Sequence, residues 1–578
     1  MRPIDRLRTT LLSERQRTAA TGDPSRRGFL RSGAAALAAA LLPPPRRARA
    51  APPAPSSQVE QEGAPRASEA YAQGDVRGYG IVPNSNTAAS ANTRALKALV
   101  DPAGSFTGTL YFPNTTGSDV YYFNDLIAFH DGVQLDLKGC ALNFTKTGDK
   151  RDSASGFIHA IRDFTIANGA LVTSYVANGG YNTGNAMAFG GRGMDSALFP
   201  NLYDRLLPAP MGNITVRNLR INAAASDNAA RGIFMLGGFD GVAIDNVWIE
   251  GQGRLAGGIY YEFGWATNEP KETDRQSSHA RNIRITNLTV TNVINEAFGA
   301  EGGYDILIDG LRMSNCGHGC LIGTGEALYF RPWVPGSERN RRASFAVRNV
   351  LGEAIRNVGL WVTGASKLSG SYLDNPPAHD NPYGLGADQQ TDLIDFSAEQ
   401  FSLSGTGKNF GILSSAATTQ IVNGTLVGFN RGIVTTQECT RFDIESVKIL
   451  DSASFGIQIG QNVSIHTPPR PAAGVIRDCL IAGSGTAGKS AGLFIGTTQS
   501  CLIENCRFGY DLSTDGKSES TQTQAVSIAA DAAGVTCRTN YVAATADGAV
   551  AYVLAGAVRR NCRIENARGI KTATGPWQ

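Results

Sequence analysis

The chain has 578 residues, of which 42% are hydrophobic and only 18% are charged. This length accommodates several domains or one elongated repeat array with a continuous core. The formal net charge of +3 is small for such a length, so neither a nucleic-acid partner nor an anionic membrane surface is expected. The 67 glycines indicate many turns.

The N-terminal segment has the features of an export signal. Residues 25–31 contain Arg26 and Arg27 followed by Phe29 and Leu30, and they resemble a twin-arginine export motif. A short apolar run over 33–42 and a small-x-small site over 48–50 follow. The run is too short for a permanent membrane anchor. We therefore expect a signal peptide over 1–50, a disordered linker over 51–75, the twin-arginine machinery as a partner, and a periplasmic or secreted mature protein.

The nine cysteines do not predict a disulfide framework. Twin-arginine substrates fold before export, in a reducing compartment, so free thiols are favoured. Six cysteines recur once or twice per repeat, as small buried residues in a ladder would: Cys439, Cys479, Cys501, Cys506, Cys537 and Cys562. Cys316 and Cys320 flank His318 but lack a fourth ligand, so we expect neither a metal nor another cofactor.

A repeat of short apolar segments fills the chain after residue 146. Residues 213–221, 242–249, 282–290 and 306–313 each read as two short alternating strands broken by an Asn or Asp-Gly corner. A small residue followed by an apolar one begins a third strand. The apolar members of this series include Phe298 and Cys320, and later Ile412, Ile433 and Ile457, so the tightest spacings lie in the low twenties. Such a period predicts an all-β, single-stranded parallel β-helix over 147–578.

Residues 76–146 are suited to cover the first open end of this array. A helical pattern over 88–100 is followed by a Gly-Thr-Leu-Tyr-Phe-Pro strand over 108–113 and a second strand over 133–139. This opening resembles the pectate-lyase-like superfamily of right-handed β-helices, in which a helix caps the first coil. The resemblance implies a right-handed β-helix with an N-terminal cap and first coil over 76–146.

Stacking the repeat in register predicts which side chains share an outer face. The apolar residue of each small-apolar pair should point inward, and alternate residues should point outward. Glu262 and Glu301 then fall in one outward column, and Tyr260 and Trp361 fall in a second, where their rings would suit sugar stacking. The position two residues before the apolar one carries Arg231, Glu296 and His318.

This third column resembles the polygalacturonase-type glycoside hydrolases. Residues 317–323 are similar to the family's Gly-His-Gly-Ile-x-Ile-Gly motif, and Glu296 precedes His318 by one repeat, a spacing like the family's. The departures are equally informative. Arg231 stands where the family has its first Asp, Asn295-Glu296 replaces Asp-Asp, and 361–363 replaces Arg-Ile-Lys. The resemblance therefore implies a shared scaffold without the family's clamp for galacturonate carboxylates.

Paired carboxylates predict cleavage of glycosidic bonds. One protonated carboxyl assists the leaving oxygen, and a second carboxylate activates water or attacks the sugar. The candidate catalytic residues are Glu262, Glu296, Glu301 and His318. If Glu262 and Glu301 lie one coil apart, their separation suits a retaining enzyme, whereas an extra coil in the long gap between them would suit inversion, towards which the family resemblance leans. The candidate substrate-binding residues are Arg231, Tyr260, Tyr261, Trp361 and, from two polar insertions, Trp265, Arg331 and Trp333.

Two alternatives remain open from the sequence. A uronate lyase or epimerase would remove the proton at C5 with a base such as Tyr260, Tyr261 or His318, while Arg231 or Arg331 neutralises the carboxylate. A non-catalytic β-helix would bind glycans through the same face or serve a structural role. For an enzyme of either kind, the expected substrate is a polysaccharide or oligosaccharide. No helical cap pattern closes the C-terminal end, so an oligomer is also possible.

Overall fold

A computed structural model gives the arrangement of the chain from residue 70 to residue 566. Gaps in the description fall at 102–103, 126, 146–153, 158–161, 174–184, 191–210, 224–230, 237–238, 263–280, 302–304, 324–342, 364–393, 437–438, 462–471, 486–490, 518, 544–549 and 555–561. The chain divides into two units, and every described residue belongs to the second, Gly63–Gln578. The expected signal peptide and most of the expected linker lie outside the described residues.

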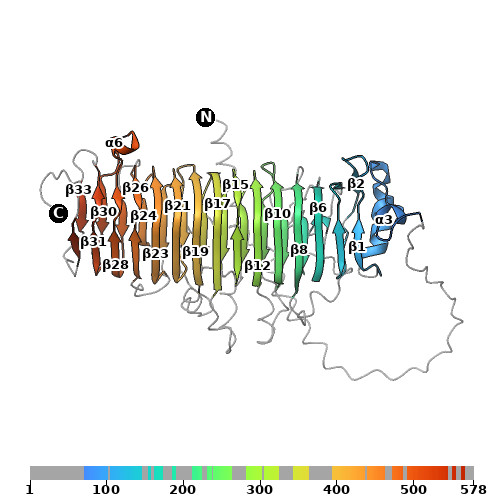
Figure 1. Cartoon of the computed structure of the whole chain (residues 1–578), viewed down its shortest axis with the longest axis horizontal. Coiled ribbons are helices and arrows are strands. Elements are labelled where there is room, and N and C mark those ends of the chain that lie inside the picture. Colours follow the sequence, from blue (N-terminus) through green and yellow to red (C-terminus); the bar gives the residue numbers. More distant parts are fainter. Residues whose placement is uncertain are drawn as a thin grey trace, which may run out of the picture. The chain divides into compact units, whose positions relative to one another are not determined.

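The N-terminal end of this unit is helical, as the sequence predicts. Two short 3-10 helices, η1 (Val76–Tyr79) and η2 (Asn86–Ala88), precede the α-helix α3 (Ala89–Val100). The apolar side of α3 is buried through Leu96, Leu99 and Val100, and Figure 1 shows the helix beside β1 and β2 at the blue end of the strands. The side chain of Asn92 in α3 is fully buried and bonds both the backbone N–H and the carbonyl of Val82, each at 2.9 Å. This pairing satisfies the polar groups that the cap buries.

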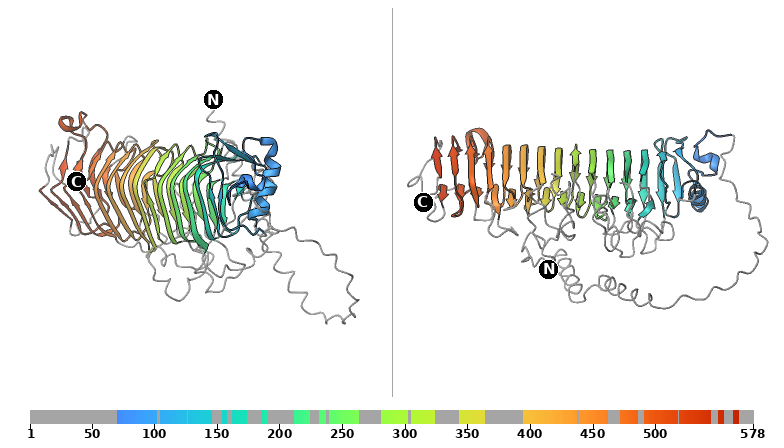
Figure 2. Two further views of the ribbon diagram at one scale, coloured as in Figure 1. Left: turned by 45° about the vertical axis from the view of Figure 1, so that its right-hand side comes forward. Right: turned by 90° about the horizontal axis from the view of Figure 1, so that it is seen from below.

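Two parallel sheets form the rest of the unit (Figures 1 and 2). The 13-stranded sheet contains β5 (Ala154–Phe157), β7 (Asn185–Gly190), β9 (Arg231–Leu236), β11 (Gly257–Glu262), β13 (Glu296–Glu301), β16 (His318–Gly323), β18 (Leu360–Thr363), β20 (Phe410–Ser414), β22 (Arg431–Thr436), β24 (Ile457–Gln461), β27 (Ala491–Ile495), β30 (Gln524–Ile528) and β33 (Val550–Leu554). Successive members pair directly and in parallel, so each is one coil further along the chain.

The 21-stranded sheet forms the remaining faces of the coils. It contains β1 (Gly108–Tyr111), β2 (Val120–Phe123), β3 (Val133–Asp136), β4 (Ala141–Phe144), β6 (Arg162–Thr173), β8 (Met211–Asn222), β10 (Phe239–Glu250), β12 (Arg281–Thr291), β14 (Ile306–Asp309), β15 (Arg312–Ser314), β17 (Ala343–Ile355), β19 (Ile394–Gly405), β21 (Thr418–Val427), β23 (Arg441–Leu450), β25 (Ala472–Arg477), β26 (Leu480–Ala482), β28 (Thr498–Glu504), β29 (Arg507–Phe508), β31 (Val535–Arg538), β32 (Tyr541–Val542) and β34 (Arg563–Glu565). A coil contributes either one long bent strand or two short strands to this sheet.

A left-handed residue bends each long strand, and it is usually asparagine. Asn218, Asn246 and Asn287 have φ angles of 50°, 51° and 52° and lie at the same corner of successive coils. Asparagine tolerates this region better than other side-chain-bearing residues. Its amide also stabilises the stack, because the Asn246 Nδ2 donates to the Asn218 Oδ1 at 2.9 Å. The Asn corners predicted from the sequence are therefore confirmed.

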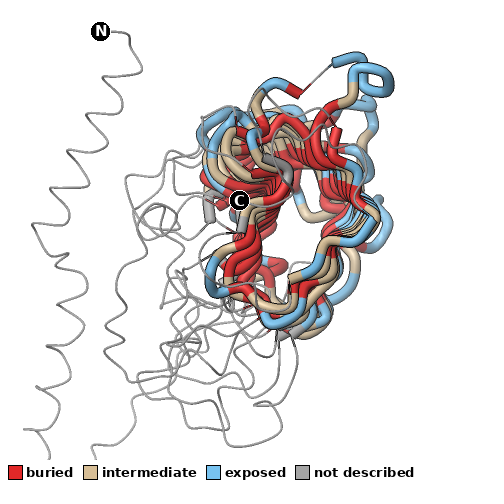
Figure 3. Tube along the Cα trace, turned by 90° about the vertical axis from the view of Figure 1, so that its left-hand side faces the viewer, coloured by how far each residue is buried: buried red, intermediate tan, exposed pale blue. Residues whose placement is uncertain are grey.

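A ladder of apolar side chains fills the interior of the coils, and Figure 3 shows buried residues along the walls of the tube. Phe298 pairs with Cys320, Ile412 with Ile433 and Ile433 with Ile457, which confirms the predicted period. Each fully buried side chain of this size contributes about 1.5–3 kcal/mol. None of the nine cysteines, all of them among the described residues, forms a disulfide; eight are buried and Cys562 is half-buried, so the ladder role predicted for cysteine is confirmed.

Glycine precedes the inward apolar residue because the coils approach closely there. A Cβ atom at Gly359 would lie 2.4 Å from the carbonyl oxygen of Gly411, and one at Gly411 would lie 2.6 Å from that of Gly432. Both separations are far below van der Waals contact. The small residue in the repeat is thus a requirement of coil spacing.

Within the part of the chain that the structure describes, no helix has the length and apolarity needed to cross a membrane.

Candidate functional site

The outer face of the 13-stranded sheet carries the predicted site. Its register places side chains in columns that run from coil to coil. The first outer column, in order along the chain, contains Asn185, Arg231, Gly257, Glu296, His318, Val358, Phe410, Arg431 and Phe455. The second outer column contains Phe234, Tyr260, Gly299, Leu321, Trp361, Leu413, Val434, Gln458 and Phe494. Sequence stacking predicted that Arg231, Glu296 and His318 share a column, and the register confirms it.

A buried ion pair joins two coils in the first outer column. The Arg231 Nε donates to the Glu296 Oε1 at 2.8 Å, and only 10% and 4% of the two side chains are exposed. The pair spans Gly257 of the intervening coil, where a Cβ atom would lie 2.3 Å from the Glu296 Oε1. The backbone N–H of Arg231 donates to the Asn185 Oδ1 at 2.8 Å. A carboxylate held in this way is oriented by the arginine and shielded from solvent.

The ring of Tyr260 covers this ion pair. It stacks on Phe234 of the preceding coil with an interplanar angle of 3° and a centroid separation of 6.3 Å. The Arg231 guanidinium carbon lies 4.9 Å from the Tyr260 ring centroid, which is within the range of a cation–π interaction. A Cβ atom at Gly299 would lie 2.5 Å from the ring. Phe234 of the preceding coil therefore supports the Tyr260 ring, and Gly299 of the following coil leaves room for it because it has no side chain.

His318 follows Glu296 in the first outer column and is neutral at physiological pH. Burial lowers its pKa to about 4, and the charge of Arg356 acts in the same direction. Its Nε2 shares a hydrogen bond of 3.1 Å with the Asn357 Nδ2, and its ring lies 5.8 Å from that of Trp361. The Nδ1 is buried and has no hydrogen-bond partner among the described residues. The imidazole can thus orient a ligand or accept a hydrogen bond, but it is a weak base.

The two cysteines that flank His318 point away from it. Cys316 and Cys320 are packed in the interior of the coils, whereas His318 lies in the first outer column. Alternation along the strand separates the sulfur atoms from the imidazole, so these three residues do not form a metal site. Over the described ranges, no group of three or more His, Cys, Asp or Glu side chains is arranged to hold a metal ion.

Glu262 and Glu301 end two neighbouring strands, β11 and β13. Tyr261 pairs directly with Ala300, so the next position on each strand is a glutamate. No additional coil lies between them, although the sequence that separates them is nearly twice as long as the repeat. This settles the register that the sequence left open. Glu262 lies two residues after Tyr260 on β11, whereas Glu296 and Glu301 lie at opposite ends of β13, about 16 Å apart.

The remaining predicted residues differ in their accessibility. Tyr261 is fully buried in the interior core, so it does not line the outer face, and the hypothesis that it contacts substrate does not fit the structure. Trp361 does belong to the second outer column, but only 2% of it is exposed because it packs with Leu321 and Leu413. An open stacking platform at Trp361 is therefore also disfavoured. Trp265, Arg331 and Trp333 lie outside the described residues.

Sequence reasoning missed several residues that support the site. Asn185 bonds the backbone of Arg231, Phe234 carries the Tyr260 ring, and Asn357 bonds His318. The gap in sequence between Asn185 and Arg231 is about twice the repeat, so no periodic signal linked the two. Asn357 comes two residues before the small-apolar motif of its coil, in a turn that the repeat pattern does not constrain.

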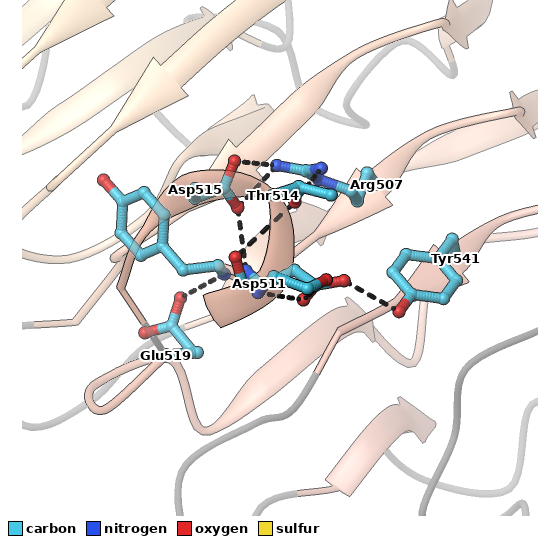
Figure 4. A network of polar contacts seen from close by, with 8 residues as sticks. Arg507, Asp511, Thr514, Asp515, Glu519 and Tyr541 are labelled. Atoms are coloured by element: carbon cyan, nitrogen blue, oxygen red, sulfur yellow. Dashed lines mark hydrogen bonds and ion pairs between the residues drawn. The ribbon is translucent and has the colours of Figure 1, made fainter.

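A second polar network near the C-terminal end is structural (Figure 4). Asp511 accepts hydrogen bonds from the backbone and the side chain of Ser513 at the start of α6 (Leu512–Asp515). Arg507 pairs with Asp515 at 2.6 Å, and the Tyr541 hydroxyl donates to Asp511 at 3.2 Å. The buried carboxylate of Glu519 accepts five backbone N–H bonds, among them that of Gly483 at 2.8 Å. Nearby donors supply hydrogen bonds to these carboxylates, and the bonds hold the chain segment around α6 in place.

Comparison with known proteins finds similarity only to solved structures of low sequence identity. No protein-family model matches the chain, and no curated protein matches it. Among solved structures, it is similar to the A-module of the mannuronan C-5 epimerase AlgE6 of Azotobacter vinelandii, at 12% identity and a TM-score of 0.39, over 86% of this chain and 100% of that one.

Two further structures are similar. They are the catalytic unit of a GH87 α-1,3-glucanase of Streptomyces thermodiastaticus (11% identity, TM-score 0.32, 86% and 69% coverage) and a tailspike mutant of E. coli bacteriophage HK620 in complex with a pentasaccharide (10%, 0.35, 85% and 78%). The pairing of its own strands gives this chain a parallel β-helix fold, with a short helix at its N-terminal end.

Proposed function

We propose that this protein is an exported carbohydrate-active enzyme that cleaves glycosidic bonds of a polysaccharide on the outer face of the 13-stranded sheet. The observation that carries the proposal is the pairing of β11 with β13. This pairing puts Glu262 and Glu301 at equivalent ends of neighbouring strands, with Tyr260 two residues before Glu262. Two carboxylates at this spacing are the machinery that glycoside hydrolysis requires.

The division of roles follows from the surroundings of each glutamate. Glu296 is buried, bonded to Arg231 and at the opposite end of β13 from Glu301, which suits a structural role in the coil stack. In this proposal Glu262 and Glu301 act as the acid and the base or nucleophile. Two carboxylates held close together do not ionise equally, because the charge of one raises the pKa of the other. That difference supplies the protonated group that the leaving oxygen needs.

The register of β11 and β13 also favours a mechanism that retains the configuration at the cleaved sugar carbon. Equivalent residues on neighbouring strands lie about 4.8 Å apart. Carboxyl groups of retaining glycosidases are about 5–5.5 Å apart, whereas inverting enzymes need about 6.5–9.5 Å to admit water. The backbone spacing of β11 and β13 is closer to the first geometry. Polysaccharide is the proposed partner, and export by the twin-arginine route is proposed from the motif at Arg26 and Arg27.

A panel of acidic and neutral polysaccharides, incubated with the mature chain, tests the proposal. Product is followed in three ways: new reducing ends, absorbance of unsaturated sugar ends, and inversion of configuration at C5. Reducing ends without unsaturation support the hydrolase. Unsaturated ends would instead favour a lyase, and altered C5 configuration without cleavage would favour an epimerase. Binding with no chemical change in any polymer would leave a non-catalytic glycan-binding β-helix and overturn the enzyme proposal.

A further inference from the structure

A second arginine lies in the first outer column, several coils beyond the proposed centre. Arg431 begins β22 and pairs in register with Phe410 of β20. Its guanidinium carbon lies 5.5 Å from the Phe410 ring centroid and 5.9 Å from that of Phe455, which follows it in the column. The cation is therefore held between two aromatic rings, one from the coil before and one from the coil after.

No carboxylate neutralises Arg431 among the residues that the structure describes. The Nε is buried and has no hydrogen-bond partner, and none of the ion pairs between described residues includes this side chain. Burial lowers the pKa of Arg431, yet a guanidinium remains protonated at neutral pH. Over the described ranges, the protein thus carries a half-buried positive charge without an anionic partner.

Such an arrangement costs stability unless something else uses it. Removing a charge from water is unfavourable, and an aromatic face recovers only part of the loss. A carboxylate or sulfate oxygen placed at the guanidinium would recover more, because charge-assisted hydrogen bonds to arginine are strong and directional. The two phenylalanine rings would at the same time offer apolar surface to the C–H faces of a sugar.

The distance to the proposed centre matches an extended ligand. Four coil steps separate β13, which ends at Glu301, from β22, which begins at Arg431. At about 4.8 Å per coil these steps span about 19 Å, and the five residues from the start of β13 to Glu301 add about 16 Å across the face. A glycan that reaches both positions crosses the outer face obliquely and must be several sugar units long.

We infer that Arg431, between Phe410 and Phe455, is a distal subsite for an anionic substituent, a carboxylate or a sulfate ester, of a polysaccharide bound along the outer face. The inference rests on the proposed function for the direction of the chain across the outer face. It deepens that function by naming the substrate class, which is an acidic polysaccharide.

Binding of defined polymers to the mature chain tests this subsite. The probes are polygalacturonate, its carboxyl-reduced derivative, dextran sulfate and unmodified dextran, titrated by calorimetry at low and high salt. Arg431→Gln should weaken binding of the preferred charged polymer about tenfold or more. The neutral polymers should be unaffected. Binding of polygalacturonate or of dextran sulfate tells a carboxylate site from a sulfate site.

The matched control is Arg441→Gln, because Arg441 is exposed on the 21-stranded sheet and this change removes the same charge from another face. Equal loss in both variants would mean that only net charge matters, and it would overturn the subsite. So would unchanged affinity in Arg431→Gln, or no binding of either charged polymer by the unsubstituted chain. Arg431→Lys keeps the charge but loses the planar fork, so an intermediate affinity with an unchanged melting temperature separates binding from folding.

Failure of the proposed function would look different. If Arg431 governs binding but no polymer is altered chemically, the enzyme proposal is lost and the subsite stands. If a neutral polysaccharide is cleaved and Arg431→Gln has no effect on its binding or cleavage, the subsite is lost and the enzyme proposal stands.

Discussion

Two arginines occupy the same outward column of this β-helix in opposite electrostatic settings. Arg231 is buried against Glu296 and covered by Tyr260, so its charge is satisfied within the protein. Arg431 lies between two phenylalanine rings, and no carboxylate of the described residues pairs with it. The first arrangement stabilises the stack of coils, whereas the second leaves a guanidinium available to bind a ligand. A repetitive scaffold can therefore present the same residue type for structure in one coil and for recognition in another.

The largest expected effect is the loss of the carboxylate that pairs with Arg231. Glu296→Ala removes the carboxylate that bonds the buried Arg231 Nε, and we expect the free energy of unfolding to fall by about 3–5 kcal/mol. Denaturant unfolding followed by circular dichroism measures the change. The double variant Arg231→Met, Glu296→Leu removes both charges and should recover most of the loss. An equal loss in the double variant would contradict the ion-pair explanation.

A smaller loss is expected from Gly257→Ala. The added Cβ atom would lie 2.3 Å from the Glu296 Oε1 and 2.9 Å from the Arg231 Cδ, so the ion pair must shift. We expect a loss of about 1–3 kcal/mol, typical of overpacking. In the background of the double variant the cost should shrink, because the two apolar replacements are not tied to each other by a hydrogen bond and can move apart. A cost that stays constant across the two backgrounds would show that the glycine serves the backbone instead.

The pH dependence of stability tests the environment of His318. Its pKa is about 4 in the folded chain, compared with 6.5 for an ordinary histidine. The unfolded chain therefore binds the proton more tightly, and His318 lowers stability as the pH falls through 6.5 towards 4. We expect His318→Gln to reduce the loss of stability between about pH 7 and pH 5, measured as urea midpoints. If the wild-type and variant midpoints shift equally between these pH values, His318 is not the titrating group.

The smallest effect on stability is expected at Arg431. Because the described part of the folded protein gives this side chain no ion pair, Arg431→Gln should leave the free energy of unfolding within about 1 kcal/mol of the original, or raise it slightly. Thermal unfolding in the absence of glycan measures this. A loss comparable to that of Glu296→Ala would remove the contrast between the two arginines and assign Arg431 a structural role.

The fold could be predicted from the sequence because each coil of the β-helix repeats the same corner, glycine and inward apolar residues. The Asn corners, the glycine before each inward residue and the period of Phe298, Cys320 and their equivalents all follow from coil geometry. The shared column of Arg231, Glu296 and His318 could be predicted for the same reason. The repeat also places Glu262 and Glu301 at equivalent positions.

Other features of the site depend on contacts that have no period. The sequence predicts Glu296 only as one of several candidate catalytic residues and gives no sign that it pairs with Arg231 across Gly257. It also treated Trp361 as a platform, but neighbouring coils bury the indole. Whether an outward side chain is open or covered depends on the size of residues in adjacent coils. Insertions of unequal length hide which coils are adjacent, as the long gap between Glu262 and Glu301 shows.

The most direct test of catalysis on this face compares product formation by three variants on a polysaccharide that the protein alters. Glu262→Gln and Glu301→Gln each remove one proposed catalytic carboxylate, and Glu353→Gln removes an exposed one on the 21-stranded sheet. We predict that the first two lower the turnover rate by about 10²–10⁴-fold, whereas Glu353→Gln matches the unsubstituted protein. Full activity in both Glu262→Gln and Glu301→Gln would contradict the assignment of catalysis to the ends of β11 and β13.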